Sequence, residues 1–276
     1  MQLLNIDTNP KTVKGQKHGY MTAILYLAPY KASGKNVCPM AHIAKCWEPC
    51  LNTAGHGGIA KRGSVIATDA GDLPDNVVQR ARIARTQFYH DDRAAFMTQL
   101  VREIEAFIRK ARRKGLVPVV RLNGTSDIQW ETGHAVRRLS AGAAKMKPSA
   151  AASALLAERY PSIFAAFPDV QFYDYTKIAK RFRRTLPDNY HLTLSYSAAA
   201  ADYAKQCLKA HADGAALAVV ARDNATKPAH AVTSLASGPL VDGDAHDLRF
   251  LDPRGALVVL KAKGRARRDV GGFVVG

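Results

Sequence analysis

Three of the four cysteines in this 276-residue chain lie close together near its beginning. Cys38, Cys46 and Cys50 fall within thirteen residues, with His42 midway between the first two, whereas Cys207 lies far away in an alanine-rich stretch. Thiolates are soft ligands that hold zinc ions and iron–sulfur clusters, and imidazole is a further zinc ligand. We therefore predict a metal or cluster site within residues 36–58.

The spacing of these side chains excludes one straight helix as the metal-binding element. Eight helical residues rise about 12 Å, which is far more than one ion can bridge with zinc–sulfur bonds of about 2.3 Å. Pro39 and Pro49 also interrupt helical hydrogen bonding. We expect an irregular loop that wraps around its cofactor.

Two versions of the site remain open. In the first, Cys38, His42, Cys46 and Cys50 form a closed structural zinc site, with His56 as another candidate ligand. In the second, the three thiolates bind three irons of a four-iron cluster and leave the fourth iron open. The spacing matches neither paired C-x-x-C zinc motifs nor the C-x-x-x-C-x-x-C loop of radical enzymes. Packed structural cysteines are the alternative, but polar residues surround these positions, as in a loop.

Polar residues recur where the predicted strands end, and parallel α/β folds bind ligands at that edge of the sheet. We predict catalytic roles for Asp127, Asp174 and Lys177. The predicted substrate- or cofactor-binding residues are Asn123, Thr125, Ser126, Thr176, Arg222, Lys261, Lys263 and Arg265, together with Gly57 and Gly58, whose backbone could approach a ligand closely. The alternative is that these residues serve only as turn and helix-cap residues.

The elements that must position these residues alternate along the chain. The pattern predicts strands over 21–28, 117–122, 170–175, 191–195, 216–221, 248–251 and 256–261, and helices over 76–90 (capped by Asp75), 93–114, 149–164, 177–184 and 198–212. Such alternation indicates parallel strands joined by helical crossovers. We expect a single α/β domain over 1–276: a (β/α) barrel-like fold, complete or incomplete, or alternatively an open doubly wound sheet. Residues 133–148 read as an inserted flexible loop, and the first 20 residues as irregular.

The chain carries 40 Lys and Arg against 23 Asp and Glu, a formal net charge of +17. A field of this size attracts polyanions, and we predict nucleic acid as the partner, DNA in preference to RNA. The basic residues gather at 109–114, 177–184 and 261–268. A basic surface that serves only solubility is the alternative.

Several functional classes are disfavoured by what the sequence lacks. No apolar run reaches about 18 residues, so we expect no membrane span. The beginning of the chain lacks the layout of a signal peptide, and four cysteines make no disulfide scaffold, so a reducing cytoplasm is expected. No phosphate-binding loop or dinucleotide fingerprint occurs in context.

Several segments of the chain together match a known family pattern: 36–39 with Cys46, Cys50 and 51–55, then 78–85, 121–127, 170–177, 247–252 and 261–265. In these segments the chain resembles the gene product 88 family of phages and mobile elements. The resemblance covers most of the chain from about residue 30 and implies a protein of a phage or mobile element, acting in the host cytosol, with no established activity. More distantly, a three-cysteine loop early in a (β/α) architecture is similar to iron–sulfur radical enzymes that bind S-adenosylmethionine.

Three functions follow from these features. The first is a metal- or iron–sulfur-dependent enzyme that modifies a base in nucleic acid. The second is a zinc-stabilised base-exchange enzyme, resembling a transglycosylase, in which Asp127 or Asp174 attacks the sugar. The third is a non-catalytic DNA-binding protein with a zinc loop.

Overall fold

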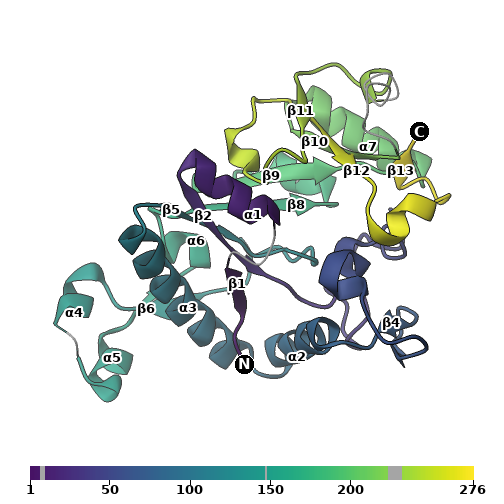
Figure 1. The fold of residues 1–276 in the computed structure, drawn as a ribbon. Helices are drawn as coiled ribbons and strands as arrows, with labels where there is room; N and C mark the ends of the chain where they lie inside the picture. Colours follow the sequence, from purple (N-terminus) through teal and green to yellow (C-terminus); the bar gives the residue numbers. More distant parts are fainter. Residues whose placement is uncertain (7–9, 147, 223–231) are drawn as a thin grey trace.

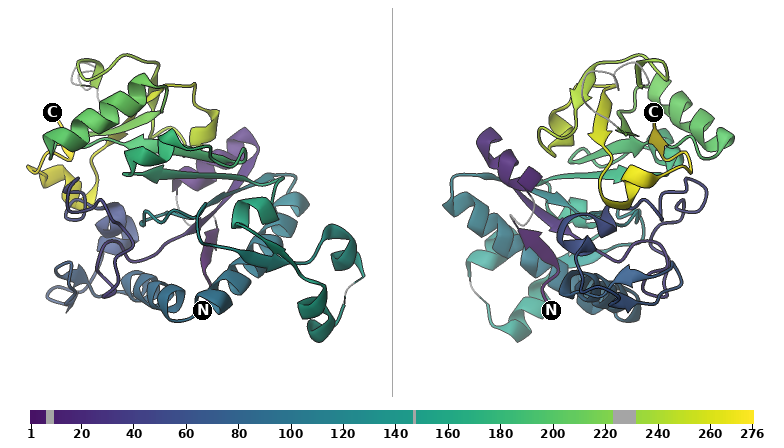
Figure 2. Two further views of the ribbon diagram at one scale, coloured as in Figure 1. Left: turned by 180° about the vertical axis from the view of Figure 1, so that it is seen from behind. Right: turned by 45° about the vertical axis from the view of Figure 1, so that its right-hand side comes forward.

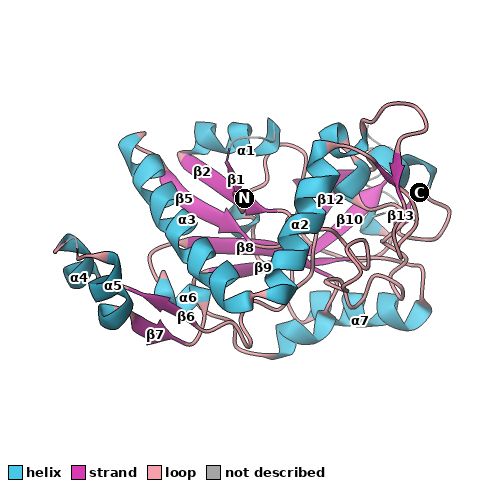
Figure 3. Ribbon diagram, turned by 90° about the horizontal axis from the view of Figure 1, so that it is seen from below, coloured by secondary structure: helices cyan, strands magenta, loops and turns pink. Residues whose placement is uncertain are grey.

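Runs of valine, isoleucine, leucine and tyrosine form a sheet whose central strands are parallel. In the computed structural model, which describes residues 1–6, 10–146, 148–222 and 232–276, six parallel strands lie in the order β2 (Tyr20–Leu25), β5 (Val117–Arg121), β8 (Gln171–Thr176), β9 (Tyr190–Ser195), β10 (Leu217–Ala221) and β12 (Leu257–Lys261). Figure 3 shows them side by side. The predicted mixed α/β class with a mostly parallel sheet is confirmed.

Shorter strands complete the sheet. At one edge β1 (Leu4–Ile6) pairs antiparallel with β2, and at the other β11 (Leu240–Asp242) pairs parallel with β12. The short β13 (Val274–Val275) pairs with the carboxyl end of β10. From β2 to β10 the strands follow one another in chain order, without the reversal of a doubly wound sheet. Within the described residues, the two edge strands β1 and β11 do not pair with each other, so closure of the sheet into a barrel is not shown.

Two helices link the first parallel strands. Asn76 caps α2 (Val77–Asp91), and Asp92 caps α3 (Arg93–Arg113), each by accepting a backbone N–H three residues on. The apolar side of α3 buries Phe96, Leu100 and Ile104 in the core, as their three-four spacing predicts. Figure 1 shows α2 and α3 beside the sheet.

The remaining helices are short, apart from α7 (Ala201–Ala212), which packs near β9 and β10. Among them are α1 (Pro10–Gly15), α6 (Ile163–Ala166) and the 3-10 turns η1 (Gln16–His18), η4 (Ala179–Arg183), η5 (Arg249–Leu251) and η6 (Gly264–Arg268). Leu248 and Phe250 around η5 pack on Tyr173 and Val119, across the sheet from the core under α3. No helix within the described residues is long and apolar enough to cross a membrane.

The region between β5 and β8 differs from the prediction. The predicted loop 133–148 contains β6 (Val136–Arg138) and α4 (Ala141–Lys145), although Lys147 lies outside the described residues. The predicted helix 149–164 is wrong as one element: α5 (Ala150–Leu156) ends early, β7 (Glu158–Tyr160) pairs with β6, and α6 follows. Pro161 is incompatible with a continuous helix. Figure 2 shows α4 and α5 projecting from the body.

Other predicted elements also need correction. The predicted strand 248–251 is wrong: residue 248 precedes the 3-10 turn η5, which covers 249–251. Asp75 does not cap α2 but forms an ion pair with Arg80 at 2.6 Å, while Asn76 supplies the cap. The first 20 residues, expected to be irregular, contain β1, α1 and η1.

Candidate functional site at the carboxyl edge of the sheet

The cysteine loop follows β2 and is irregular, as its prolines and spacing predict. It folds through tight turns, in which Ala44 N–H donates to Met40 O at 2.9 Å and Cys46 N–H to Ala41 O at 3.2 Å. Lys45 between them adopts a left-handed backbone (φ 45°). After Cys50, whose Sγ accepts the Asn52 N–H, the chain forms the 3-10 turns η2 (Leu51–Thr53) and η3 (Gly55–Gly58).

Two contacts attach this loop to the carboxyl ends of the strands. The Cys38 thiol donates to Thr125 O at 3.8 Å, in the segment that follows β5. The Ser197 hydroxyl, just after β9, donates to Ala44 O at 2.7 Å. The structure thus brings the cysteine loop to the edge where the predicted polar residues lie.

The three thiols are half-buried and close enough to influence one another electrostatically. Burial raises the pKa of each, that of Cys46 to about 11. Neighbouring thiolates have a smaller effect in the same direction: negative charge on Cys50 and Cys46 raises the pKa of Cys38, and negative charge on Cys50 raises the pKa of Cys46. The Lys177 ammonium lowers the pKa of both Cys46 and Cys50. The three thiols therefore lie within electrostatic range of one another, and Cys46 and Cys50 lie within range of Lys177.

The predicted ligands of a one-ion zinc site are Cys38, His42, Cys46 and Cys50. Within the part of the chain that the structure describes, no three His, Cys, Asp or Glu side chains stand close enough to hold one metal ion, and His42 is exposed. A tetrahedral zinc ion would draw its thiolates to within about 4 Å of one another. In an iron–sulfur cluster each thiolate binds a different iron, so its sulfurs stand further apart.

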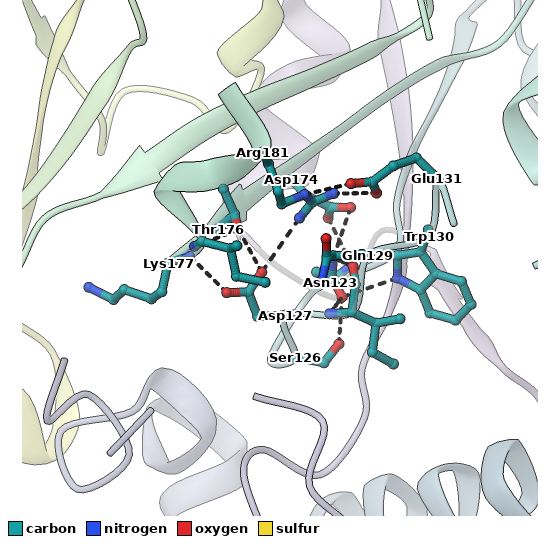
Figure 4. A network of polar contacts seen from close by, with 12 residues as sticks. Asn123, Ser126, Asp127, Gln129, Trp130, Glu131, Asp174, Thr176, Lys177 and Arg181 are labelled. Atoms are coloured by element: carbon teal, nitrogen blue, oxygen red, sulfur yellow. Dashed lines mark hydrogen bonds and ion pairs between the residues drawn. The ribbon is translucent and has the colours of Figure 1, made fainter. Parts of the chain in front are cut away.

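Beneath the loop, Asn123 organises the turn that follows β5 (Figure 4). Its Oδ1 accepts three hydrogen bonds, from the Ser126 hydroxyl (2.9 Å), Ile128 N–H (3.0 Å) and Trp130 Nε1–H (3.1 Å). Its backbone N–H donates to Asp174 Oδ1 at 2.8 Å. Asn123 was predicted to bind ligand, and it is only 3% exposed.

Asp127 joins this turn to β8. Its two oxygens accept the Thr176 hydroxyl at 2.8 Å and the Lys177 backbone N–H at 2.7 Å. Burial raises the pKa of Asp127. The Lys177 ammonium extends away from this carboxylate, donates to the carbonyls of Ser195 (3.0 Å) and Tyr196 (2.9 Å), and its pKa is lowered by burial.

Sequence reasoning missed the arginine that links both carboxylates. Arg181, 1% exposed, makes two hydrogen bonds to Glu131 and lies 3.5 Å from Asp127. It also donates to the Tyr190 hydroxyl, which donates to Asp174 at 3.0 Å. Asp174 is fully buried, and burial raises its pKa to about 7. Within a basic segment, Arg181 gave no signal that distinguished it from surface arginines.

A second missed group lies on α2. Gln79 and Arg82 are buried and hold the chain that follows Cys50. Gln79 Nε2 donates to the carbonyls of Asn52 (2.9 Å) and Gly57 (2.7 Å), and Arg82 Nη1 donates to Asn52 Oδ1 at 2.6 Å. Both residues fall inside 78–85, one of the segments that resemble the family. That resemblance was the one sequence feature that could have pointed to them.

Gly57 and Gly58, predicted for close approach to a ligand, lie in close contact with the protein's own backbone. A Cβ at Gly57 would lie 2.4 Å from Asn52 O, and one at Gly58 would lie 2.1 Å from Thr53 O. Their small size therefore lets η2 and η3 pack together.

The family model described as Gene product 88 matches residues 2–275. The chain belongs to this family. Neither a curated protein nor a solved structure matches it significantly, so the comparisons do not support the more distant similarity to radical enzymes.

The basic residues of this gene product 88 protein divide between the two edges of the sheet. Residues 261–268 follow β12 at the carboxyl edge, and η6 contacts η2 of the cysteine loop (Figure 1). There Arg265 donates to Asp72 O at 3.0 Å, and Lys263 pairs with Asp244 at 2.6 Å, while Lys261 is exposed. Residues 109–114 end α3 and precede β5, at the amino edge.

Arg222 and the residues after it were also predicted to bind ligand. The Arg222 guanidinium donates to the carbonyls of Gly276, Arg267 and Asp269 at 2.7–2.9 Å, so it holds the end of the chain against η6. Residues 223–224, which share its predicted strand-end position, lie outside the described residues.

Proposed function

We propose that this protein is a metal-dependent enzyme that modifies a base in nucleic acid, with an iron–sulfur cluster bound by Cys38, Cys46 and Cys50. The observation that carries the proposal is that three half-buried thiols from one loop lie within electrostatic range of one another at the carboxyl edge of the sheet, where Asp127 and Lys177 also influence them. Zinc is the alternative metal.

Positive charges near Cys46 and Cys50 favour the thiolates that a cluster needs, against the opposing effect of burial. Metal binding requires thiolates, and the positive charges of Lys177 and Arg82 lower the pKa of Cys50 against the effect of burial. A four-iron cluster held by three thiolates would supply redox or Lewis-acid chemistry at its open iron. S-adenosylmethionine is a cosubstrate compatible with such a centre. The one-directional strand order supports a barrel-like sheet with this site at its rim.

The polar residues below the loop have distinct proposed roles. The charges of Asp127 and Lys177 influence the thiols, and we assign these two residues to binding and proton transfer at the rim. Asp174 has no exposed surface and holds the N–H of Asn123, so its role is positioning. Thr125, Ser126 and Thr176 hold the same turn through hydrogen bonds.

The substrate would lie along the basic carboxyl edge. Lys261, Lys263 and Arg265 come from the segment that contacts the cysteine loop, so phosphates bound there would place a base near the sulfurs. The charge of +17 supports a polyanionic substrate, and duplex DNA is our first choice. A phage protein with this role would act in the host cytosol.

The base-exchange alternative requires a carboxylate that can reach a sugar carbon. Asp174 is fully buried, and both oxygens of Asp127 accept hydrogen bonds from β8 and the residue that follows it, which argues against either as a nucleophile. A covalent protein–DNA adduct trapped after denaturation would favour this alternative. A binding protein without catalysis would retain DNA affinity and produce no altered base.

The experiment is anaerobic purification, reconstitution with iron and sulfide, and measurement of iron, sulfide and visible absorbance. The intact protein is expected to hold about four irons with the absorbance of a cluster. Cys38→Ala, Cys46→Ala and Cys50→Ala should each lose most of the iron. Cys207→Ala is the matched control and should retain it, because Cys207 belongs to α7, is fully buried and is not one of the three proposed ligands.

Two results would overturn the cluster. Stoichiometric zinc in a colourless protein would establish the zinc alternative. Equal iron in the wild type and in a variant without all three loop cysteines would remove the metal centre altogether. Incubation of the reconstituted protein with DNA and S-adenosylmethionine, followed by nucleoside mass spectrometry, tests base modification.

A further inference from the structure

A cleft at the amino edge of the sheet, opposite the cysteine loop, has the size of a small-molecule site. Its volume is about 460 Å³, within the range of about 300–1,000 Å³ that ligand pockets occupy. It opens between η4, the start of β9, the end of α7 and the turn after η5. None of the residues proposed above for catalysis or metal binding lines it.

The floor of the cleft carries a buried carboxylate with unused hydrogen-bonding capacity. The Asp252 side chain is 4% exposed and lies 3.2 Å from Nη1 of the fully buried Arg249. Asp252 Oδ2 and Arg249 Nη1 face each other, and among the described residues neither has a further hydrogen-bond partner. His191 lines the same floor, and burial lowers its pKa to about 4, so its imidazole is neutral. A ligand N–H would satisfy the carboxylate.

The mouth of the cleft is cationic and its walls are apolar. Arg183, Lys209 and Arg254 are exposed around it. Lys209 pairs with Asp213, whereas Arg183 and Arg254 form no ion pair within the described part of the chain. Phe182, Leu186 and Phe250 line the walls and could enclose a planar ring.

We propose that this cleft binds a mononucleotide, with the N–H edge of its base toward Asp252 and its phosphate at Arg183 and Arg254. A nucleotide has a group to match each level of the cleft. Its base carries hydrogen-bond donors for the carboxylate on the floor and a planar ring for the apolar walls, and its phosphate is an anion for the cationic mouth. This proposal is independent of the cluster and of the nucleic-acid substrate.

Two elements connect the cleft to the polar network below the cysteines. Tyr190 lines the cleft, and its hydroxyl donates to Asp174. The turn η4 supplies Phe182 and Arg183 to the cleft and Arg181 to the ion pairs with Glu131 and Asp127. A nucleotide in the cleft therefore contacts the elements that fix both carboxylates, and its binding stabilises their arrangement.

The test is titration calorimetry of the full chain with AMP, GMP, CMP and dTMP, with adenosine, guanosine, cytidine, thymidine and inorganic phosphate as separate arms. At least one nucleotide is expected to bind with one-to-one stoichiometry, and its nucleoside at least about tenfold more weakly. Arg254→Glu should remove the advantage of the phosphate. Gln206→Trp, at an exposed α7 position that lines the cleft, should block nucleotide and nucleoside alike.

Arg109→Glu is the control, because it makes the same charge change outside the cleft. Absence of binding by all four nucleotides would overturn the proposal. Binding that survives both Arg254→Glu and Gln206→Trp would also overturn it, by placing the site elsewhere. Phosphate that binds as tightly as the nucleotide would exclude recognition of the base. Cys50→Ala should bind nucleotide normally even where it loses iron, which keeps the two proposals separable.

Discussion

Asn123 makes more of the hydrogen bonds that hold the site together than either Asp127 or Asp174 does. One oxygen accepts three hydrogen bonds, its Nδ2 donates to Ile128 O at 2.9 Å, and its backbone N–H donates to Asp174. An aspartate here could not donate to Ile128 O, and a serine could not reach as many partners. The residue therefore specifies the shape of the turn from which Thr125 contacts Cys38.

Replacing this amide should be costly. Asn123→Ala leaves the N–H groups of Ile128 and Trp130 buried without that acceptor, and should lower the free energy of unfolding by about 3 kcal/mol. Urea unfolding followed by tryptophan fluorescence measures the change. Ser126→Ala removes one donor and leaves the oxygen with two partners, so it should cost about 1 kcal/mol. Equal losses in the two variants would show that the shared oxygen is not the organising feature.

Asp174 should make stability depend on pH. Its folded-state pKa of about 7 lies above the ordinary carboxyl value, so between about pH 4 and 7 the folded protein binds a proton that the unfolded chain has released. Stability therefore falls as pH rises through this window. Asp174→Asn removes that proton. The wild type should lose on the order of 2 kcal/mol relative to the variant between pH 5 and 7.5, as measured by urea unfolding. Parallel pH profiles would contradict the assignment.

The type of a residue alone did not show whether its side chain lies at the candidate site or on the surface. Asp127, Lys177 and Asn123 were predicted because strand ends are recognisable and because their side chains are polar, and the structure places all three just after β5 or β8. Arg181 lies in the same basic run as exposed Arg183 and Arg184, yet it is buried, and only the fold distinguishes it. Its partner Glu131 is fifty positions away, at a distance that local patterns do not encode.

At the scale of elements, the sequence predicted the helices and strands that have a strong apolar pattern. The strands β2, β5, β8, β9, β10 and β12 and the helices α2, α3 and α7 all appear near their predicted positions, because each presents a clear apolar face or a buried apolar run. The hairpin of β6 and β7 was missed because its three-residue strands are too short to show alternation. The alanine-rich stretch suggested one helix, but propensity is a weak prior where proline intervenes.

The packing of η2 against η3 should govern metal retention. Gly58→Ala places a methyl group where Thr53 O stands, so the two turns must separate, at a cost of about 2 kcal/mol. We expect the reconstituted variant to hold less iron than the wild type. Gly142→Ala is the control, because a Cβ there meets nothing within 4 Å and alanine favours the helix α4. Iron content and thermal unfolding of both variants measure the effect; full iron in Gly58→Ala would contradict it.

Over the whole molecule, the direction of the parallel strands decides at which edge of the sheet each basic cluster lies. Parallel strands place everything that follows a strand at one edge and everything that precedes a strand at the other. The cluster 261–268 therefore shares an edge with the cysteines, and the cluster 109–114 does not. The third cluster, 177–184, contributes less surface charge than its sequence suggests, because Lys177 and Arg181 are buried. A net charge cannot predict this division, since it depends on topology.

Charge reversal at the two edges tests whether nucleic acid follows this division. Arg267→Glu with Arg268→Glu, and Arg112→Glu with Arg113→Glu, change the net charge equally at exposed positions. If DNA lies along the carboxyl edge, the first pair should weaken duplex binding about tenfold or more and flatten the slope of log affinity against log salt by about 2. The second pair should change both quantities little, because screening confines each charge to about 10 Å. Fluorescence anisotropy across a salt series measures both. Equal losses from the two pairs would mean that the field of the whole protein attracts DNA without a preferred edge.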